Sequence, residues 1–277
     1  MELKTSKQIR AMTECSIMIA LSTVLSLVKI IDMPYGGSVT IASMLPIVIA
    51  VYRHGMGWGL GAALVNSAIQ LLLGLNTLSY FTTWQSIIAI ILLDYIVAFS
   101  VFALAAIFKK IEKRQNYALL YGVLLCSLLR YLCHVISGAT VWAGLSIPTE
   151  AALLYSLSYN ATYMLPETIV LASVCAYITS VVDFKSKIPT RMKNRNMEKG
   201  EVYATLGSGL LFVGTIIADV CIIFPHLQDP ENGEFVFKYL ENANFILLGI
   251  ISAVGIAAAV ALFLYAKNKR KAENTTA

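Results

Sequence analysis

The feature that most constrains this chain is a series of apolar runs, several of them longer than the roughly 20 residues that cross a bilayer as a helix. Apolar residues make up 58% of the sequence and charged residues only 13%. Lipid offers no water to the backbone, so helical spans are the architecture that this composition favours. The alternating pattern of an outer-membrane barrel is absent. The sequence therefore predicts an all-α polytopic membrane protein.

The basic residues predict how the spans are oriented. We expect eight spans, near residues 14–32, 40–52, 57–74, 84–108, 117–142, 151–181, 204–225 and 245–266. The 21 Lys and Arg residues fall before the first span and after the second, fourth, sixth and eighth, leaving only Lys29, Arg130 and Lys238 elsewhere. The positive-inside rule then places both termini in the cytoplasm. This distribution accounts for the net charge of +5 without a nucleic-acid partner.

A basic, polar segment over 183–203 divides the chain. We predict a six-span substrate-binding membrane domain over 1–182 and a cytoplasmic linker over 183–203. A two-span C-terminal hairpin of unknown role over 204–266 and a cytoplasmic tail over 267–277 complete the predicted organisation. A basic cytoplasmic linker is typical of a topology anchor that also attracts anionic lipid.

Small side chains are spaced for close helix packing. The pair Ser16 and Ala20 lies on the first span, and a second series occurs on the last span, at Gly249, Ala253, Ala257 and Ala261. Such stripes let helices approach closely in lipid, either within the chain or against another subunit. The five cysteines lie in or at the ends of apolar spans without a CxxC pair, so we interpret them as core residues and predict no metal site or disulfide.

Ionisable and polar side chains inside predicted spans are functional candidates, because charge is unfavourable in lipid. The fourth span enters from outside near residue 84, so Asp94 and Tyr95 lie roughly 15 Å down at about 1.5 Å per residue. By the same topology, His134 lies in the outer half of the fifth span, and Tyr155 and Asn160 in that of the sixth. The sequence thus predicts a pocket that opens to the exterior.

The fifth span carries one polar stripe. Arg130, His134, Gly138 and Trp142 follow at four-residue steps, so they share one face of a helix. With the carboxylate of Asp94, this face suits a small, flat, cationic heterocycle, because aromatic rings attract a desolvated cation. The alternative is an internal Asp94–Arg130 ion pair among core aromatic side chains.

Four sequence blocks carry a resemblance to a known family. They are "ECSIMIALSTVLS" (14–26), "DYIVAF" (94–99), "RYLCHVISGATVW" (130–142) and "YSLSYN" (155–160). In order and spacing they resemble the thiamine-binding S components of energy-coupling factor (ECF) transporters. The resemblance covers about residues 8–182 and implies a six-helix S-component bundle, followed here by two additional transmembrane helices.

The resemblance implies a role for each matching residue. His134, Gly138 and Trp142 would line a thiamine pocket, with Gly138 making room and Trp142 stacking on a ring of the ligand. Tyr155 and Asn160 would hydrogen-bond its aminopyrimidine end.

Further residues match with departures from the family. Asp94 would engage the ligand, although the family usually has Glu there, and Tyr95 would be a polar and aromatic contact. Tyr35 is a loose counterpart of a pocket aromatic residue in the first external loop. Ser16 and Ala20 fit the small-xxx-small motif by which the family docks on its partner.

The resemblance also implies partners. The chain would capture thiamine, or a close analogue, at the bacterial cytoplasmic membrane. Transport would need a transmembrane coupling subunit and two ATP-binding subunits. We expect no cofactor, since thiamine would be cargo.

Two other functions remain as alternatives. A stand-alone secondary transporter would use Asp94 or Glu167 to couple protons. An intramembrane hydrolase is disfavoured, because His54, His134 and His226 belong to no HExxH motif. The sequence also lacks a GxxxxGK[ST] phosphate loop, so any ATP hydrolysis would belong to partner subunits.

Overall fold

The chain divides into two compact units. The structure is a computed structural model that describes residues 2–33, 36–145, 149, 151–192, 199–223, 226 and 238–276. One unit covers the described residues up to Thr190, and the other begins at Arg191. The division falls within 183–203, the segment predicted as a linker.

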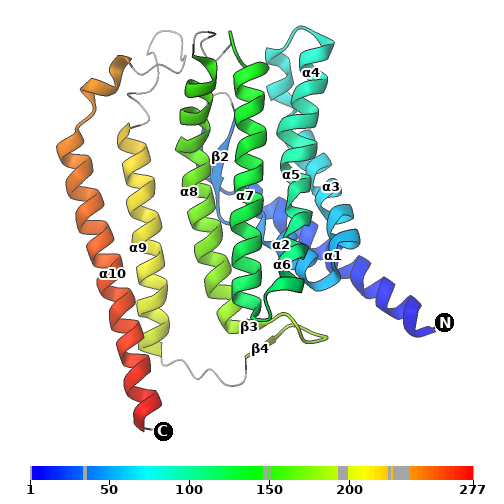
Figure 1. Cartoon of the computed structure of the whole chain (residues 1–277), viewed down its shortest axis with the longest axis vertical. Helices are drawn as coiled ribbons and strands as arrows, with labels where there is room; N and C mark the ends of the chain where they lie inside the picture. The colour runs from blue at the N-terminus through cyan, green and yellow to red at the C-terminus, as the bar shows by residue number, and fades with distance from the viewer. Residues whose placement is uncertain are drawn as a thin grey trace. The chain divides into compact units, whose positions relative to one another are not determined.

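The first unit is mainly helical, with two small sheets (Figure 1). Its helices are α1 (Glu2–Leu27), α2 (Leu45–His54), α3 (Met56–Leu73), η1 (Leu75–Tyr80), α4 (Trp84–Ile90), η2 (Ile91–Val97), α5 (Ala98–Ser100), η3 (Val101–Ala105), α6 (Ala106–Ile111), α7 (Gln115–Thr140) and α8 (Ala152–Val181). The sheets pair β1 (Lys29–Asp32) with β2 (Ser38–Thr40), and β3 (Val182–Asp183) with β4 (Thr190–Arg191).

Among the described residues, six helical segments are long and apolar enough to cross a bilayer. They are Thr5–Leu27, Met56–Leu73, Trp84–Ile111, Gln115–Thr140, Ala152–Val181 and Phe245–Ala266. Five of these belong to the first unit, and each overlaps a predicted span. The protein is therefore a multi-pass membrane protein.

Helix α2 replaces the predicted span over 40–52. Its ten residues extend about 15 Å, half the thickness of a bilayer core. All residues from Leu45 to Tyr52 are buried, so the helix lies in the core and contacts α1, α3 and α7. An apolar run that faces protein on every side forms a buried helix, and hydropathy alone does not distinguish it from a span.

The β1–β2 pair was not expected in an all-α chain. The first span was predicted to continue to residue 32, but α1 ends at Leu27 and an antiparallel pair follows, in which Lys29 faces Thr40. Val39 and Thr40 are buried. Non-helical backbone is tolerated at membrane depth where protein buries it, and strand pairing satisfies its hydrogen-bonding groups.

The span over Trp84–Ile111 changes helix type along its length. It begins as α4, continues as a π-helix, η2, and then passes through α5 and the 3₁₀ segment η3 into α6. The π-helix carries Asp94 and Tyr95. Wide turns of this kind occur frequently at functional sites, because they displace side chains from the regular helical register.

The second unit consists of α9 (Lys199–Ile223), η5 (Lys238–Asn242) and α10 (Phe245–Thr276). Helices α9 and α10 lie side by side (Figure 1). The hydroxyl of Ser252 donates to Asp219 over 2.7 Å, and a Cβ on Gly255 would lie only 1.9 Å from the hydroxyl oxygen of Thr215. This glycine allows the close packing of the pair.

The small-residue stripe predicted on the last span does not form this contact. Its four members are all exposed, namely Gly249, Ala253, Ala257 and Ala261. The packing face carries Ser252, Gly255 and Ala259 instead. Of the two predicted C-terminal spans, α10 contains one candidate span. Helix α9, which covers most of 204–225, is not among the six, and that span stays a prediction.

Candidate functional site

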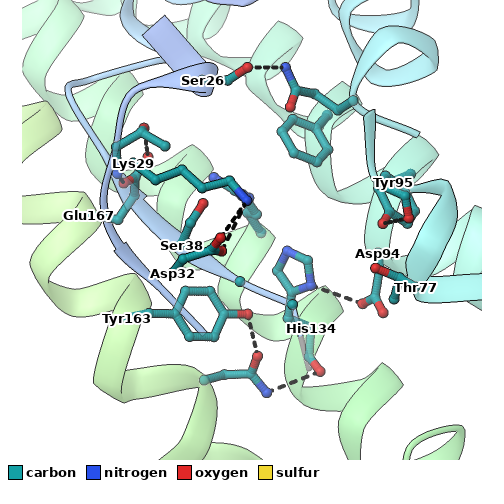
Figure 2. A pocket seen from close by; sticks show the side chains of 18 of the residues that line it. Ser26, Lys29, Asp32, Ser38, Thr77, Asp94, Tyr95, His134, Tyr163 and Glu167 are labelled. Atoms are coloured by element: carbon teal, nitrogen blue, oxygen red, sulfur yellow. Dashed lines mark hydrogen bonds and ion pairs between the residues drawn. The ribbon is translucent and has the colours of Figure 1, made fainter. Parts of the chain in front are cut away.

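A cavity of about 290 Å³ lies inside the first unit. Its walls come from the end of α1, the β1–β2 pair, α3, η1, the π-helix η2, α5, α7 and α8. Figure 2 shows Lys29, Asp32 and Ser38 of the β1–β2 pair on one side and Asp94 and Tyr95 on the other. Residues far apart in the sequence thus line one cavity.

The carboxylate of Asp94, which lines the cavity, contacts three side chains. Its Oδ1 lies 2.9 Å from Nδ1 of His134, and its Oδ2 accepts hydrogen bonds from the Ser137 hydroxyl at 2.8 Å and the Trp142 indole at 3.2 Å. All three partners come from α7 or the two residues after it. The network fixes the π-helix against α7, and it gives the carboxylate hydrogen-bond partners at membrane depth.

One ring nitrogen of His134 has no hydrogen-bond partner among the described residues. Its Nδ1 faces Asp94, whereas its Nε2 is buried and has no hydrogen-bond partner in the described part of the chain. His134 lines the cavity. A buried polar atom left unsatisfied is unfavourable by about 1–3 kcal/mol, so Nε2 is a natural contact for a bound molecule.

Trp142 combines a polar and an aromatic contact. Its ring packs edge-on against Phe81, with centroids 4.8 Å apart, and lies 6.0 Å from the ring of Tyr80. Only 8% of the residue is exposed. Since the indole also donates to Asp94, the ring orientation is fixed before any ligand binds.

Asn160 connects α7 and α8. Its amide nitrogen donates to the backbone oxygens of His134 and Ser156, and its oxygen accepts from the Tyr163 hydroxyl at 2.7 Å. A Cβ on Gly138 would lie 2.1 Å from the Ser156 hydroxyl oxygen. Gly138 therefore makes room for α8, whereas the family resemblance implied room for the ligand.

Glu167 anchors the β1–β2 pair. It is buried, and it accepts hydrogen bonds from the backbone nitrogen and the hydroxyl of Thr40. Gly37, on the connection between the strands, adopts a φ of +91°, and a Cβ there would lie 2.8 Å from the Tyr163 ring. Two residues of α8 thus position the strands over the cavity.

Arg130 does not form the alternative ion pair with Asp94. Its guanidinium lies over the Phe99 ring, 4.5 Å from the centroid, and it pairs with no carboxylate in the described residues. Its Nε is buried without a hydrogen-bond partner. Both Arg130 and Glu167 line the cavity, so the cavity contains more charge than the sequence motifs indicated.

Six of the eight predicted ligand-binding residues line the cavity, namely Asp94, Tyr95, His134, Gly138, Trp142 and Asn160. Tyr155 does not line it: it lies one helical turn before Tyr159, on the same face of α8 but beyond the cavity. Tyr35 lies outside the described residues. The cavity-lining side chains that the motifs missed come mainly from the β1–β2 pair and α8, including Lys29, Asp32, Tyr159, Tyr163 and Glu167.

Most of the first unit matches a known family. Residues 12–187 match the family described as thiamine transporter protein (Thia_YuaJ). The chain belongs to this family. The match spans more than half of the sequence and contains every residue that lines the cavity.

Two relatives agree with the family match. The chain is 34% identical over 180 residues to the thiamine transporter ThiT of Bacillus subtilis (strain 168), covering 61% of this chain and 90% of that protein. It also has the fold of the solved structure of ThiT from Listeria monocytogenes. That likeness has a TM-score of 0.50 and 21% identity, and it covers 62% of this chain and 94% of the other. The family is one of transporters and not of enzymes.

Proposed function

We propose that this chain captures thiamine on the outer side of the membrane and delivers it as the S component of an ECF transporter. The observation that carries the proposal is the cavity itself, which lies within the family match and presents the free Nε2 of His134 beside the Asp94 carboxylate. A transporter of a small polar cation needs such a concave, partly charged site.

The chemistry of the cavity suits thiamine. The vitamin joins a cationic thiazolium ring to a flat aminopyrimidine. Three carboxylates, from Asp32, Asp94 and Glu167, line the cavity together with two cations, Lys29 and Arg130. Asp32 pairs with Lys29 at 3.0 Å, and the lining as a whole has one carboxylate more than it has cations, which favours a cationic ligand. The aromatic rings of Tyr95 and Trp142 offer faces or edges to flat heterocycles. His134 supplies the polar atom that is free to meet the ligand, since the amide of Asn160 is already bonded within the protein.

The orientation of the basic residues supports entry from outside. With the basic residues that precede α7 and follow α8 on the cytoplasmic side, as the positive-inside rule predicts, the cavity would lie toward the outer ends of α7 and α8. The first unit would then be the complete substrate-binding bundle. The second unit would add two spans to it.

A docking surface for the energising subunits is available on α1. Ser16 and Ala20 are both exposed, so they do not pack against the described part of this chain. Close helix approach in lipid needs small residues at this spacing. We propose that the transmembrane coupling subunit binds here, and that two ATP-binding subunits hydrolyse the ATP.

Ligand binding to the purified chain tests the proposal. Tryptophan fluorescence should be quenched by thiamine, and comparison with its pyrimidine moiety and its phosphate esters would define the ligand. A Trp142→Phe variant assigns the signal among the three tryptophans. Uptake by vesicles that contain this chain and no ATPase would contradict the proposal and favour a secondary transporter.

A further inference from the structure

A second cavity, of about 160 Å³, lies at the opposite end of the first unit. Helix α1 reaches both: Ser26 lines the larger cavity and Arg10 the smaller one, about 24 Å apart along the helix axis. The remaining walls come from the end of α2, from α6 and from the turn after β3. The lining residues are Arg10, Tyr52, Arg53, His54, Lys109, Phe184, Lys185, Ser186 and Lys187.

Arg53 builds this cavity and is not itself free to bind. Its side chain is only 4% exposed and pairs with Glu14 through Nε at 2.6 Å and Nη2 at 2.9 Å. Its remaining donors reach the backbone oxygens of Phe184, Ser186 and Lys187. One buried guanidinium therefore fixes the turn that carries the lysines against α1 and α2.

The charge around the cavity is not balanced by the protein. Its lining includes five Lys and Arg side chains and no carboxylate. The nearby acids are already engaged: Glu14 by Arg10, Arg53 and His54, and Asp183 by the backbone nitrogen of Lys185. The ammonium groups of Lys109 and Lys185 each donate one hydrogen bond to a backbone oxygen, of Arg53 and Lys113 respectively, and keep further N–H groups. The cavity therefore presents donors to an anion.

The size and the surroundings of the cavity indicate which anion. Its volume is several times the roughly 30 Å³ of one water molecule, so a polyatomic anion fits. Large apolar side chains beside it are exposed, including Ile9 and Met12 on α1, Ile111 at the end of α6 and Ile188 on the turn. Exposed apolar residues next to a cationic cavity are arranged like the boundary between acyl chains and headgroups.

We propose that this cavity binds a phosphate group, supplied by an anionic phospholipid headgroup or by free phosphate. Cations that only set the topology need no cavity and no buried guanidinium to form its wall. Basic pockets at the ends of transmembrane helices are known to bind lipid headgroups. The site is separate from the proposed thiamine cavity, and it stands whether or not thiamine is the transported ligand.

Thermal unfolding of the purified full chain in detergent tests the site. Three additions are compared: phosphatidylglycerol, phosphatidylcholine, and inorganic phosphate at an ionic strength matched with chloride. The variant Lys185→Gln/Lys187→Gln removes two cations of the cavity. The control Lys110→Gln/Lys113→Gln removes two cations from the same end of the unit but outside the lining.

We expect phosphatidylglycerol, but not phosphatidylcholine, to raise the unfolding temperature. Its apparent affinity should fall about tenfold in the Lys185/Lys187 variant, because each cation near a lipid phosphate contributes to binding, and should be unchanged in the control. Stabilisation by inorganic phosphate with the same dependence on the variants would identify free phosphate as the source. Equal effects in both double variants, or no effect of either phosphate source, would overturn the proposal. Thiamine binding should be unchanged in all variants.

Discussion

At the scale of single residues, Asp94 links three donors that would otherwise be independent. The imidazole of His134, the hydroxyl of Ser137 and the indole of Trp142 all contact its carboxylate. Charge-assisted hydrogen bonds of this kind are stronger than neutral ones, so they orient the side chains before a ligand arrives. Pre-orientation reduces the entropy lost on binding.

Replacing Trp142 separates its two contributions. Trp142→Ala removes both the ring and the hydrogen bond to Asp94, and we expect thiamine affinity to weaken by roughly 1–3 kcal/mol. Trp142→Phe keeps a ring against Phe81 and loses only the donor, so its affinity should lie between those of Trp142→Ala and the wild type. Isothermal titration calorimetry on all three proteins measures this. A folded Trp142→Ala variant that binds thiamine with wild-type affinity would show that Trp142 does not contribute to the site.

At the scale of elements, the approach of α7 to α8 depends on one missing side chain. A methyl group at Gly138 would overlap the hydroxyl of Ser156, so Gly138→Ala should destabilise the protein by about 1–3 kcal/mol, the usual effect of overpacking. The double variant Gly138→Ala/Ser156→Gly removes the side chain that the new methyl group would overlap, and it should recover part of the loss. Thermal unfolding in one detergent compares the three proteins. Equal stability of Gly138→Ala and the wild type would show that the helices are not closely packed here.

The elements also show what the sequence could and could not predict. Hydropathy located five of the first unit's helices. The four-residue spacing of His134, Gly138 and Trp142 predicted that they share one helical face, because helical periodicity is a local property. It did not predict the β1–β2 pair, in which Lys29 faces Thr40, because the pair is held in place by a distant residue: Glu167, which accepts the hydrogen bond from the Thr40 hydroxyl, is 127 residues away. The sequence did not predict the π-helix around Asp94 either, because its wide turns depend on contacts with other helices and not on local composition.

Individual side chains follow the same division. The sequence left an Asp94–Arg130 ion pair as the alternative to a ligand-binding role of Asp94, because the two residues have opposite charges and lie in neighbouring spans. The structure pairs Asp94 with His134, which lies one turn further along α7. Tyr155 shares the helical face of Tyr159 but lies a turn beyond the cavity, a difference in depth that periodicity does not resolve.

At the scale of the whole molecule, the larger cavity belongs to one of the two units. All of its lining lies between Ser26 and Glu167, and the family match ends at residue 187. We therefore expect a chain that ends after Thr190 to bind thiamine within about threefold of the full chain, roughly 0.7 kcal/mol. Fluorescence quenching on both purified proteins measures this. A folded, monodisperse truncated chain that does not bind thiamine would show that the second unit contributes to the site.

Transport should depend on a surface that binding does not use. Ser16 and Ala20 lie one turn apart and exposed on α1, away from the cavity. Enlarging both to Trp should leave thiamine affinity within about threefold. The same change should abolish ATP-dependent uptake, because bulky side chains prevent close helix approach to the coupling subunit. Uptake of labelled thiamine by vesicles with the complete transporter measures this loss.

The matched control enlarges another exposed pair on the same helix, Ile17→Trp/Leu21→Trp, at the same four-residue spacing. It adds two indoles to α1 on a different face, and uptake should persist. Loss of thiamine binding in the Ser16/Ala20 variant would mean that these residues support the fold of the chain itself. Uptake at the wild-type rate by the Ser16/Ala20 variant would show that these two residues do not dock the coupling subunit. Loss of uptake in the Ser16/Ala20 variant alone, with thiamine binding retained in both variants, would localise the coupling surface to one face of α1.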